Sequence, residues 1–195
     1  MRTAEIIRKT NETDIALTLA LDGSGKSEIS TGSGFMDHML ELFAAHGKFD
    51  LKVECTGDVE VDYHHSIEDI GICLGMAFKE ALGDKVGIAR YGDTTLAMDE
   101  ALILTAVDLS GRSCLMFGLN IPNPTVGAFD TELVEEFWNA FVRHAECAVH
   151  FHQFSGVNTH HIIEGAFKSV ARSLRKAVAL DADFADQLPS TKGTL

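Results

Sequence analysis

The sequence predicts an α+β domain built from two internally duplicated, βαβ-type halves. Strand-like alternation and helical periodicity follow one another in the same order twice along the chain. The motif His-His-x-x-Glu also stands at the same place in each repeat, at residues 64–68 and 160–164. We therefore expect residues 1–195 to form a single domain, with halves at about 1–92 and 93–195 and with sheets that pack against paired helices.

The first half is expected to contain two strands, a helix, a strand and a second helix. Apolar and polar residues alternate where strands are predicted, whereas apolar residues recur every three or four positions where helices are predicted. Glycine closes both helices, as it commonly does. The predicted ranges are strands at 4–9, 15–21 and 49–55 and helices at 35–47 and 64–83.

The second half repeats this order. Ser110-Gly111-Arg112 separates two predicted strands, and Asp130-Thr131 supplies a cap for the helix that follows. Residues 122–127 are predicted to form a loop, because proline and glycine interrupt regular structure. The predicted ranges are strands at 101–109, 113–117 and 147–154 and helices at 130–141 and 160–179.

Composition narrows the class of protein. A formal net charge of −13 argues against broad attraction to nucleic acid or to anionic membranes. No apolar run is long enough to predict a membrane span, and the first residues do not begin a signal peptide. The four cysteines are scattered without a CxxC pair, which predicts reduced thiols in a cytoplasmic protein.

The two halves can be aligned around their histidines. Residues 36–43 match residues 134–141, so that His38 corresponds to Glu136. His46 falls on His144 in the same alignment, and the spacing to the doubled histidines is nearly equal in the two halves. We infer an internal duplication.

Helix geometry predicts how the doubled histidines bind metal. Successive side chains on a helix point about 100° apart, so adjacent histidines serve different ions, whereas residues three or four apart share a face. His65 and Glu68 are therefore predicted to hold one ion, and His161 and Glu164 another. Each ion would also bind the other histidine of the doubled motif in the opposite repeat, which is His64 or His160. His38 and Glu136 would complete the two coordination shells.

The donor types indicate which metal is bound. Imidazole and carboxylate donors without thiolate suit Mn, Fe or Zn, and carboxylate-rich six-coordinate sites favour Mn. His150 and His152 alternate on a predicted strand, where a surface or hydrogen-bonded role is the simpler interpretation. We assign these two histidines no function.

Six short segments, spread over nearly the whole chain, form a specific combination of motifs. They are residues 34–40 (Gly-Phe-Met-Asp-His-Met-Leu), 62–69 (Asp-Tyr-His-His-Ser-Ile-Glu-Asp), 99–102 (Asp-Glu-Ala-Leu), 108–112 (Asp-Leu-Ser-Gly-Arg), 160–164 (His-His-Ile-Ile-Glu) and 189–193 (Pro-Ser-Thr-Lys-Gly). Together they resemble the imidazoleglycerol-phosphate dehydratases of histidine biosynthesis. The resemblance implies a fold like that of ribosomal protein S5 domain 2.

The resemblance also implies an activity and an assembly. The activity is that of a lyase that dehydrates D-erythro-imidazole glycerol phosphate to imidazole acetol phosphate and water, with two Mn²⁺ ions per active site. The assembly is a homo-oligomer, a 24-mer with active sites between chains. Its partner is a small phosphate substrate, not nucleic acid or a membrane.

The same resemblance assigns roles to individual residues. Position 136 stays open between Glu136 and a different group, because some members of the family have histidine there. Acid–base catalysis is expected from Glu12 and Glu164. The implied metal ligands are His38, His64, His65, Glu68, His160, His161 and Glu164. The implied substrate contacts are Glu12, His38, His46, His64, His65, Glu68 and Thr191, with phosphate contacts at Arg90, Arg112, Lys168, Ser190 and Lys192.

Helix and loop positions agree with several of the phosphate contacts. Glu164, Lys168 and Arg172 follow one another at four-residue steps and share one helical face, where we interpret Arg172 as part of a solvated row of ion pairs. Arg90 and Arg112 stand in predicted glycine-flanked loops, where a guanidinium can bind phosphate through two hydrogen bonds.

The expected reaction uses the imidazole ring of the substrate. Two metals favour its imidazolate form, the electron-rich ring expels the adjacent hydroxyl with help from a protonated carboxyl group, and Glu12 or Glu164 removes the neighbouring carbon proton. Two alternatives stay open: a metal-storage or scaffold protein, and a binuclear hydrolase whose metals activate water. Arg90, Arg112 and Lys192 speak against storage, which needs no phosphate contact.

Overall fold

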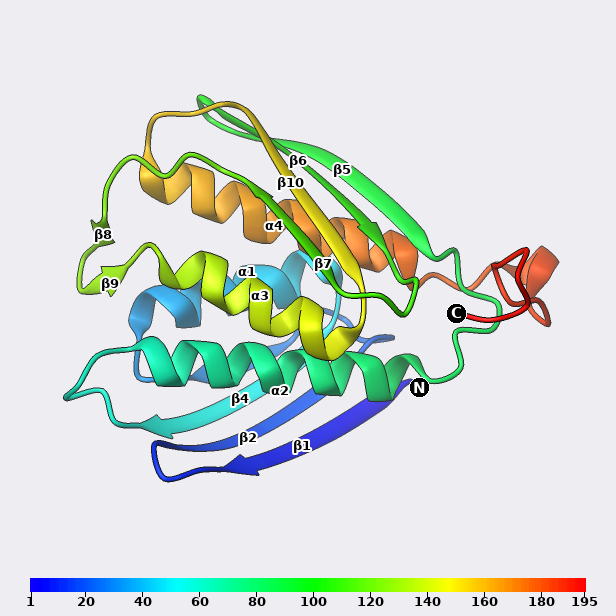
Figure 1. Cartoon of the computed structure of the whole chain (residues 1–195), viewed down its shortest axis with the longest axis horizontal. Helices are drawn as coiled ribbons and strands as arrows, with labels where there is room; N and C mark the ends of the chain where they lie inside the picture. Colours follow the sequence, from blue (N-terminus) through cyan, green and yellow to red (C-terminus); the bar gives the residue numbers. More distant parts are fainter.

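Two four-stranded sheets form the outer layers of the structure, and four long helices lie between them (Figure 1). The computed structural model describes residues 1–195. The strand order is β1-β2-β4-β3 in the first sheet and β5-β6-β10-β7 in the second. Each half of the chain therefore builds one sheet with the same topology, and the prediction of an internally duplicated α+β fold is confirmed.

The elements follow one another in the same order in both halves. The first half contains β1 (Thr3–Lys9), β2 (Thr13–Ala20), β3 (Ser27–Ser30), α1 (Gly34–Gly47), β4 (Asp50–Gly57) and α2 (His64–Leu82). The second half contains β5 (Tyr91–Met98), β6 (Ala101–Asp108), β7 (Cys114–Gly118), a small hairpin of β8 (Thr125–Val126) and β9 (Phe129–Asp130), then α3 (Leu133–Ala145), β10 (Ala148–Ser155), α4 (Thr159–Ala177) and the short 3-10 helix η1 (Ala182–Phe184).

Four strands are absent from the sequence prediction: β3, β5, and β8 and β9 of the small hairpin, of which β8 lies in the predicted loop at 122–127. β3 has four residues, of which Ile29 alone is apolar. The buried positions of β5 are Gly92 and Thr94, so the strand has no apolar face at its start. Gly92 is required there, because an added Cβ would lie 2.0 Å from the carbonyl oxygen of Ser173 in α4. The close approach of α4 thus removes the alternation by which a strand is recognised.

The helices pair across the two halves. α1 packs against α4, and α2 packs against α3. Trp138 of α3 joins the pairs, with ring centroids 6.3 Å from Phe43 of α1 and 4.9 Å from Phe167 of α4. Because of this crossing, side chains of the first half meet side chains of the second half in the middle of the molecule.

Two glycines let α2 approach α3 closely. Gly71 and Gly75 lie one turn apart on α2. An added Cβ would lie 2.6 Å from the carbonyl oxygen of Phe137 at the first position and 2.6 Å from that of Phe141 at the second. Both contacts are with backbone atoms, which cannot rotate away.

Replacing Gly71 by alanine is expected to lower the free energy of unfolding by about 1–3 kcal/mol, because the methyl group would push α3 away from α2. This loss is expected although alanine is the better helix former by about 1 kcal/mol. Chemical denaturation measures the difference. Gly34→Ala is the matched control, because nothing lies within 4 Å of its added Cβ; equal stabilities of the two variants would contradict the packing described here.

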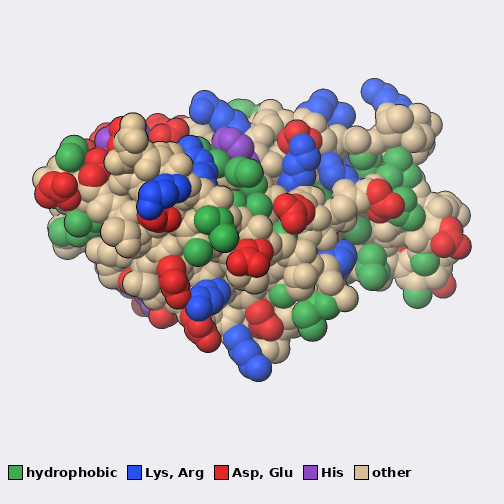
Figure 2. Space-filling model, turned by 90° about the horizontal axis from the view of Figure 1, so that it is seen from below, with side chains coloured by type: hydrophobic (Ala, Val, Ile, Leu, Met, Phe, Trp, Pro, Cys, Tyr) green, Lys and Arg blue, Asp and Glu red, His purple; other side chains and the backbone are tan.

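Charged side chains of both signs lie on the outer face of the first sheet, between apolar and neutral ones (Figure 2). Figure 2, which views the molecule from below that sheet, shows Lys and Arg interspersed with Asp and Glu. Lys52 on β4, for example, lies 3.0 Å from Glu54 and 3.6 Å from Glu28. None of the helices combines the length and the apolar character needed to cross a membrane.

Candidate metal centre

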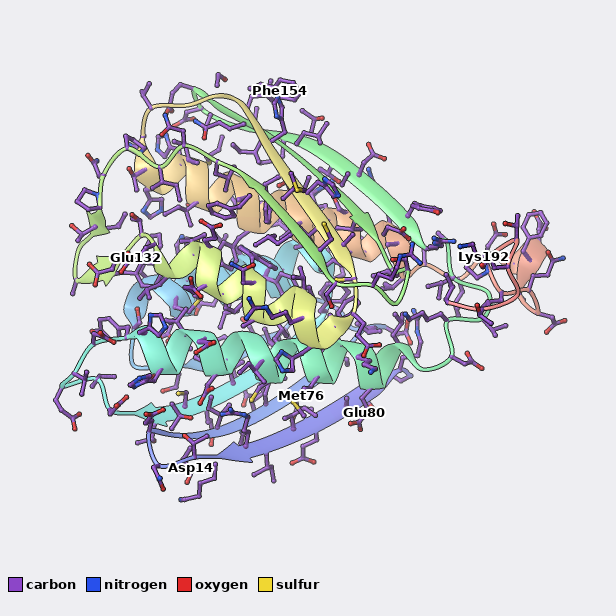
Figure 3. All side chains as sticks on the ribbon, in the orientation of Figure 1. Asp14, Met76, Glu80, Glu132, Phe154 and Lys192 are labelled. Carbon is purple, nitrogen blue, oxygen red and sulfur yellow. The ribbon has the colours of Figure 1, made fainter.

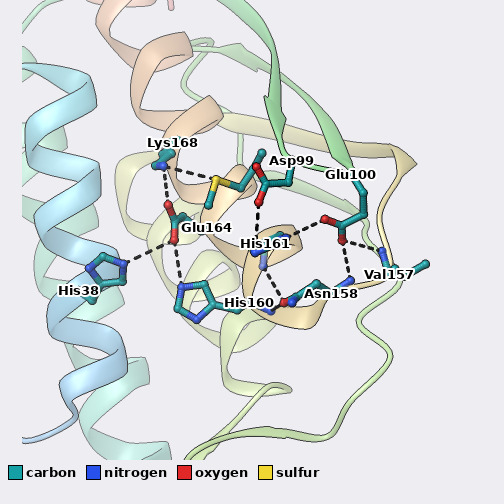
Figure 4. A network of polar contacts seen from close by, with 10 residues as sticks. His38, Asp99, Glu100, Val157, Asn158, His160, His161, Glu164 and Lys168 are labelled. Carbon is teal, nitrogen blue, oxygen red and sulfur yellow. Dashed lines mark hydrogen bonds and ion pairs between the residues drawn. The ribbon is translucent and has the colours of Figure 1, made fainter.

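Three candidate metal ligands meet where α1 packs against α4 (Figure 4). His38 comes from α1, whereas His160 and Glu164 come from the start of α4. Both histidines direct Nε2 at one carboxylate oxygen: Glu164 Oε2 lies 3.5 Å from His38 and 3.0 Å from His160. No other three metal-ligating side chains of the chain come together in this way. Two imidazoles and a carboxylate at this spacing are a suitable donor set for a transition-metal cation.

Within the second motif, His160 contacts Glu164, four residues further on, whereas His161 contacts Glu100. The predicted sharing of one ion by His161 and Glu164 stays a prediction. Asn158 sets the start of the helix, since its side chain accepts hydrogen bonds from the backbone N–H groups of His160 and His161. The expected crossing of the two halves is nevertheless present, because the third member of the group, His38, belongs to the first half.

Glu164 is held as an ionised carboxylate. Its side chain is only 8% exposed. Burial by itself would raise its pKa, but the ion pair with Lys168 and the hydrogen bond with His160 outweigh burial, so the pKa lies below its usual value. Lys168 contacts Oε1, which leaves Oε2 to the two histidines. A buried, charged, acceptor-only oxygen between two imidazoles is suited to hold a cation.

His46, a predicted substrate contact, lies in the last turn of α1. Burial lowers its pKa, and the positive charges of Lys168 and Arg172 on α4 lower it further. The imidazole of His46 is therefore neutral at physiological pH.

Two other histidines are paired with carboxylates that the sequence prediction does not include. His65 Nδ1 lies 2.9 Å from Asp58 Oδ2, and His161 Nδ1 lies 2.7 Å from Glu100 Oε2. Each hydrogen bond raises the pKa of its histidine. Glu100 is missed because it lies on the hairpin between β5 and β6, and β5 is not recognisable in the sequence. The adjacent acidic residues at 99–100 are the signal that could have found it.

The remaining predicted ligands do not come together within the chain. His64 and Glu68 are half-buried at the start of α2, and Glu136 is half-buried in α3, but they do not form a group of three donors. Glu12 stands on the turn between β1 and β2, 52% exposed, with Oε1 3.8 Å from His65 Nε2. The chain thus presents one assembled group and several separate donors.

Most of the predicted phosphate contacts lie far from the assembled group. Arg90 donates hydrogen bonds of 2.7 and 3.3 Å to Asp108 and one of 2.8 Å to the carbonyl oxygen of Pro189. Residues 190–192 follow directly, and Figure 3 shows Lys192 at the end of the molecule where α4 ends. Arg112 is exposed in the turn after β6. Lys168 is the exception, since it contacts Glu164.

The length of α4 separates the metal ligands from the basic segment. This helix has 19 residues and is therefore about 28 Å long. His160 stands in its first turn, whereas the backbone of Arg90 bonds to Ala177 at its last residue. Within one chain, a small phosphorylated molecule cannot contact both ends of this helix.

Comparison with known proteins identifies the family. Residues 31–174 match the family model of imidazoleglycerol-phosphate dehydratase. The chain belongs to the imidazoleglycerol-phosphate dehydratase family. It is 54% identical over 195 residues to the imidazoleglycerol-phosphate dehydratase of Xanthobacter autotrophicus, with 100% of this chain and 99% of the relative covered. It is 54% identical over 194 residues to that of Desulforamulus reducens, with 100% and 98% covered.

Solved structures of the same family have the same fold. The crystal structure of imidazoleglycerol-phosphate dehydratase from Staphylococcus aureus matches with a TM-score of 0.84 and 39% identity, covering 92% of this chain and 99% of that one. The structure of IGPD from Pyrococcus furiosus in complex with (S)-C348 matches with a TM-score of 0.84 and 37% identity, covering 97% and 100%. The predicted family and enzyme class are confirmed, and the alternative of a metal-storage or scaffold protein is wrong.

The segment matched by the imidazoleglycerol-phosphate dehydratase model contains both doubled motifs and Lys168. Glu12 and residues 190–192 lie outside that segment, although the full-length relatives cover them. The roles of individual residues stay predictions at this point.

Proposed function

We propose that the chain converts D-erythro-imidazole glycerol phosphate to imidazole acetol phosphate and water in histidine biosynthesis, with two Mn²⁺ ions per active site. The observation that carries this proposal is the convergence of His38 and His160 on Glu164. Membership of the dehydratase family supports the reaction, and the imidazole–carboxylate donor set supports the metal.

The donors of the chain fit manganese. His38, His160 and Glu164 would hold an ion where α1 meets α4. When bound, the metal would act as a Lewis acid that makes the imidazole of the substrate easier to deprotonate. The further ligands would be His64, His65, Glu68 and His161, with Glu136 as the open position.

The two candidate carboxylates differ in their freedom to move a proton. Glu12 is 52% exposed, and its nearest charged neighbour is His65 at 3.8 Å, so its oxygens are free to take the carbon proton next to the departing hydroxyl. Glu164 is already engaged by Lys168 and His160. We assign the base to Glu12 and the holding of positive charge to Glu164.

We propose that each active site is completed by a second copy of the chain, because about 28 Å of helix separates the metal ligands from Arg90 and residues 190–192. The 24-mer is the assembly that the family resemblance predicts.

A cytoplasmic location suits the four free cysteines of the chain.

Mixing two inactive variants tests the shared site. If Glu164 and Arg90 act in one site but come from different chains, co-assembled Glu164→Gln and Arg90→Ala subunits should regain about a quarter of wild-type activity, because that fraction of sites pairs an intact Glu164 with an intact Arg90. Activity of the co-expressed oligomer measures this. If both residues of a site come from one chain, every site stays defective and the mixture stays inactive.

A product assay tests the reaction itself. The chain, loaded with Mn²⁺, is incubated with imidazole glycerol phosphate, and the products are followed for the ketone of imidazole acetol phosphate and for inorganic phosphate. We expect the ketone to form with its phosphate retained. Release of inorganic phosphate without the ketone would favour the binuclear hydrolase and refute the dehydratase.

Protons are expected to compete with manganese for His65 and His161. Their hydrogen bonds to Asp58 and Glu100 raise the pKa of both imidazoles above 6.5, so Mn²⁺ affinity should fall as the pH drops through that raised range. Because the pKa is raised in the folded state, the metal-free chain should show the opposite trend, losing the stability of these ion pairs as the pH rises through the same range. Titrations at about pH 8 and about pH 6 measure the first effect; an unchanged affinity would contradict it.

A further inference from the structure

The two halves contain a matched arrangement around His65 and His161. In each case Nδ1 faces a carboxylate oxygen, at 2.9 Å for Asp58 and 2.7 Å for Glu100. In each case Nε2 faces a second carboxylate at 3.8 Å, that of Glu12 or that of Asp99. The second carboxylates stand on equivalent turns, between β1 and β2 and between β5 and β6.

The carboxylates at Nδ1 come from places that the duplication does not relate. Asp58 follows the end of β4, whereas Glu100 stands in the hairpin before β6. Different loops therefore supply the same contact to two equivalent histidines. The two histidines share a carboxylate at Nδ1. Because the two carboxylates stand at unrelated positions, duplication of one ancestral half does not explain why both are present.

Glu100 is anchored so that it cannot follow the histidine. Its Oε1 accepts hydrogen bonds from the backbone N–H groups of Val157 at 3.1 Å and Asn158 at 2.8 Å, and its Oε2 accepts from His161 (Figure 4). The carboxylate of Glu100 is thus held by the backbone just before α4, and the position of the imidazole is set by it.

The side chain of Asp58 makes no hydrogen bond other than the one with His65. Its Oδ2 faces His65, while its Oδ1 is buried and has no hydrogen-bond donor. A buried acceptor without a donor lowers the stability of the fold. Such a group is expected where a function, rather than stability, keeps the residue in place.

A carboxylate at Nδ1 decides which nitrogen of the imidazole can bind a metal. It has no proton to donate, so a neutral imidazole must place its proton on Nδ1 and leave the lone pair on Nε2. An amide in the same place can donate instead, which favours the opposite tautomer. We infer that Asp58 and Glu100 are positioning residues that hold His65 and His161 with Nε2 free to bind manganese. This inference rests on the proposed metal-dependent function.

Mn²⁺ binding to the full-length chain tests the inference. Free Mn²⁺ is measured by electron paramagnetic resonance during titration of metal-free wild type, Asp58→Asn and Glu100→Gln. We expect each variant to bind Mn²⁺ about 10–100-fold more weakly than wild type. Glu60→Gln, in the same loop as Asp58, and Glu135→Gln, in the first turn of α3, are exposed matched controls and should bind like wild type.

Two further measurements separate positioning from a structural defect. Asp58→Glu keeps a carboxylate, so it should recover part of the affinity that Asp58→Asn loses; equal losses would overturn the inference. Excess Mn²⁺ should return the kcat of Glu100→Gln to within a few-fold of wild type, because the loss lies in binding. A kcat that stays low at saturating Mn²⁺ would contradict a positioning role.

The results also separate this inference from the proposed function. Wild-type affinity in both variants would overturn the inference even if the wild-type chain dehydrates imidazole glycerol phosphate. Weakened binding in both variants would support it even if the wild-type chain forms no imidazole acetol phosphate. A wild-type chain that binds no Mn²⁺ would overturn both the metal proposal and the inference.

Discussion

Replacing Glu164 by glutamine is expected to lower kcat for dehydration by about a thousandfold, within the range found when a group that stabilises charge in the transition state is removed. Glutamine has the same shape but no charge. Its amide would present donors to Lys168, His38 or His160, where the carboxylate now pairs with Lys168 and faces both imidazoles. The site would lose both a proposed metal ligand and the negative charge that pairs with Lys168.

Steady-state kinetics on purified, Mn²⁺-supplemented protein measure this loss. His150→Ala is the control, since His150 is an exposed side chain on β10 without a hydrogen bond or an ion pair. It should retain wild-type activity. Equal activities of the two variants would mean that the catalytic site has been assigned to the wrong place.

Removal of metal is expected to have an effect at least as large. Lewis-acid stabilisation by a bound ion contributes several kcal/mol to the transition state, and each 1.36 kcal/mol corresponds to a factor of about ten in rate. Chelation should therefore lower the rate of dehydration by about a thousandfold or more. Readdition of Mn²⁺ should restore it.

The choice of cation supplies the control for this experiment. Imidazole donors bind first-row transition metals better than Mg²⁺ or Ca²⁺, which prefer oxygen ligands. Neither Mg²⁺ nor Ca²⁺ should replace Mn²⁺. Full activity in a sample whose metal content has been verified as negligible would exclude the metal role.

The helices could be predicted from the sequence because each has a continuous apolar face. The helix expected at 64–83 is observed at His64–Leu82, with Ile67, Ile70 and Leu74 buried against the core. The strands missing from the prediction lack the usual signal in the sequence: β3 has four residues, β8 and β9 have two each, and β5 has Gly92 where an apolar residue would reveal it. Glycine is required at position 92 because α4 packs closely against it, and this tertiary contact is not visible in the sequence.

The site could be predicted only in part. The doubled motif predicts imidazole and carboxylate donors, but positions i+3 and i+4 on a helix are both compatible with a shared face. Packing of α1 against α4 selects His160 as the partner of Glu164. Asp58 could not be assigned from the sequence because it lies in a connection whose course depends on the elements that it joins, whereas the acidic pair at 99–100 was a signal for Glu100 that the prediction did not use.

Titrating Mn²⁺ into the metal-free chain, while bound metal and the formation of imidazole acetol phosphate are followed together, tests the central claim most directly. We expect no dehydration without metal, a rate that rises with bound Mn²⁺, and saturation at about two ions per chain. A full rate before any metal binds, or bound Mn²⁺ that leaves the rate unchanged, would contradict the claim that the doubled His-His-x-x-Glu motif builds a metal-dependent dehydratase.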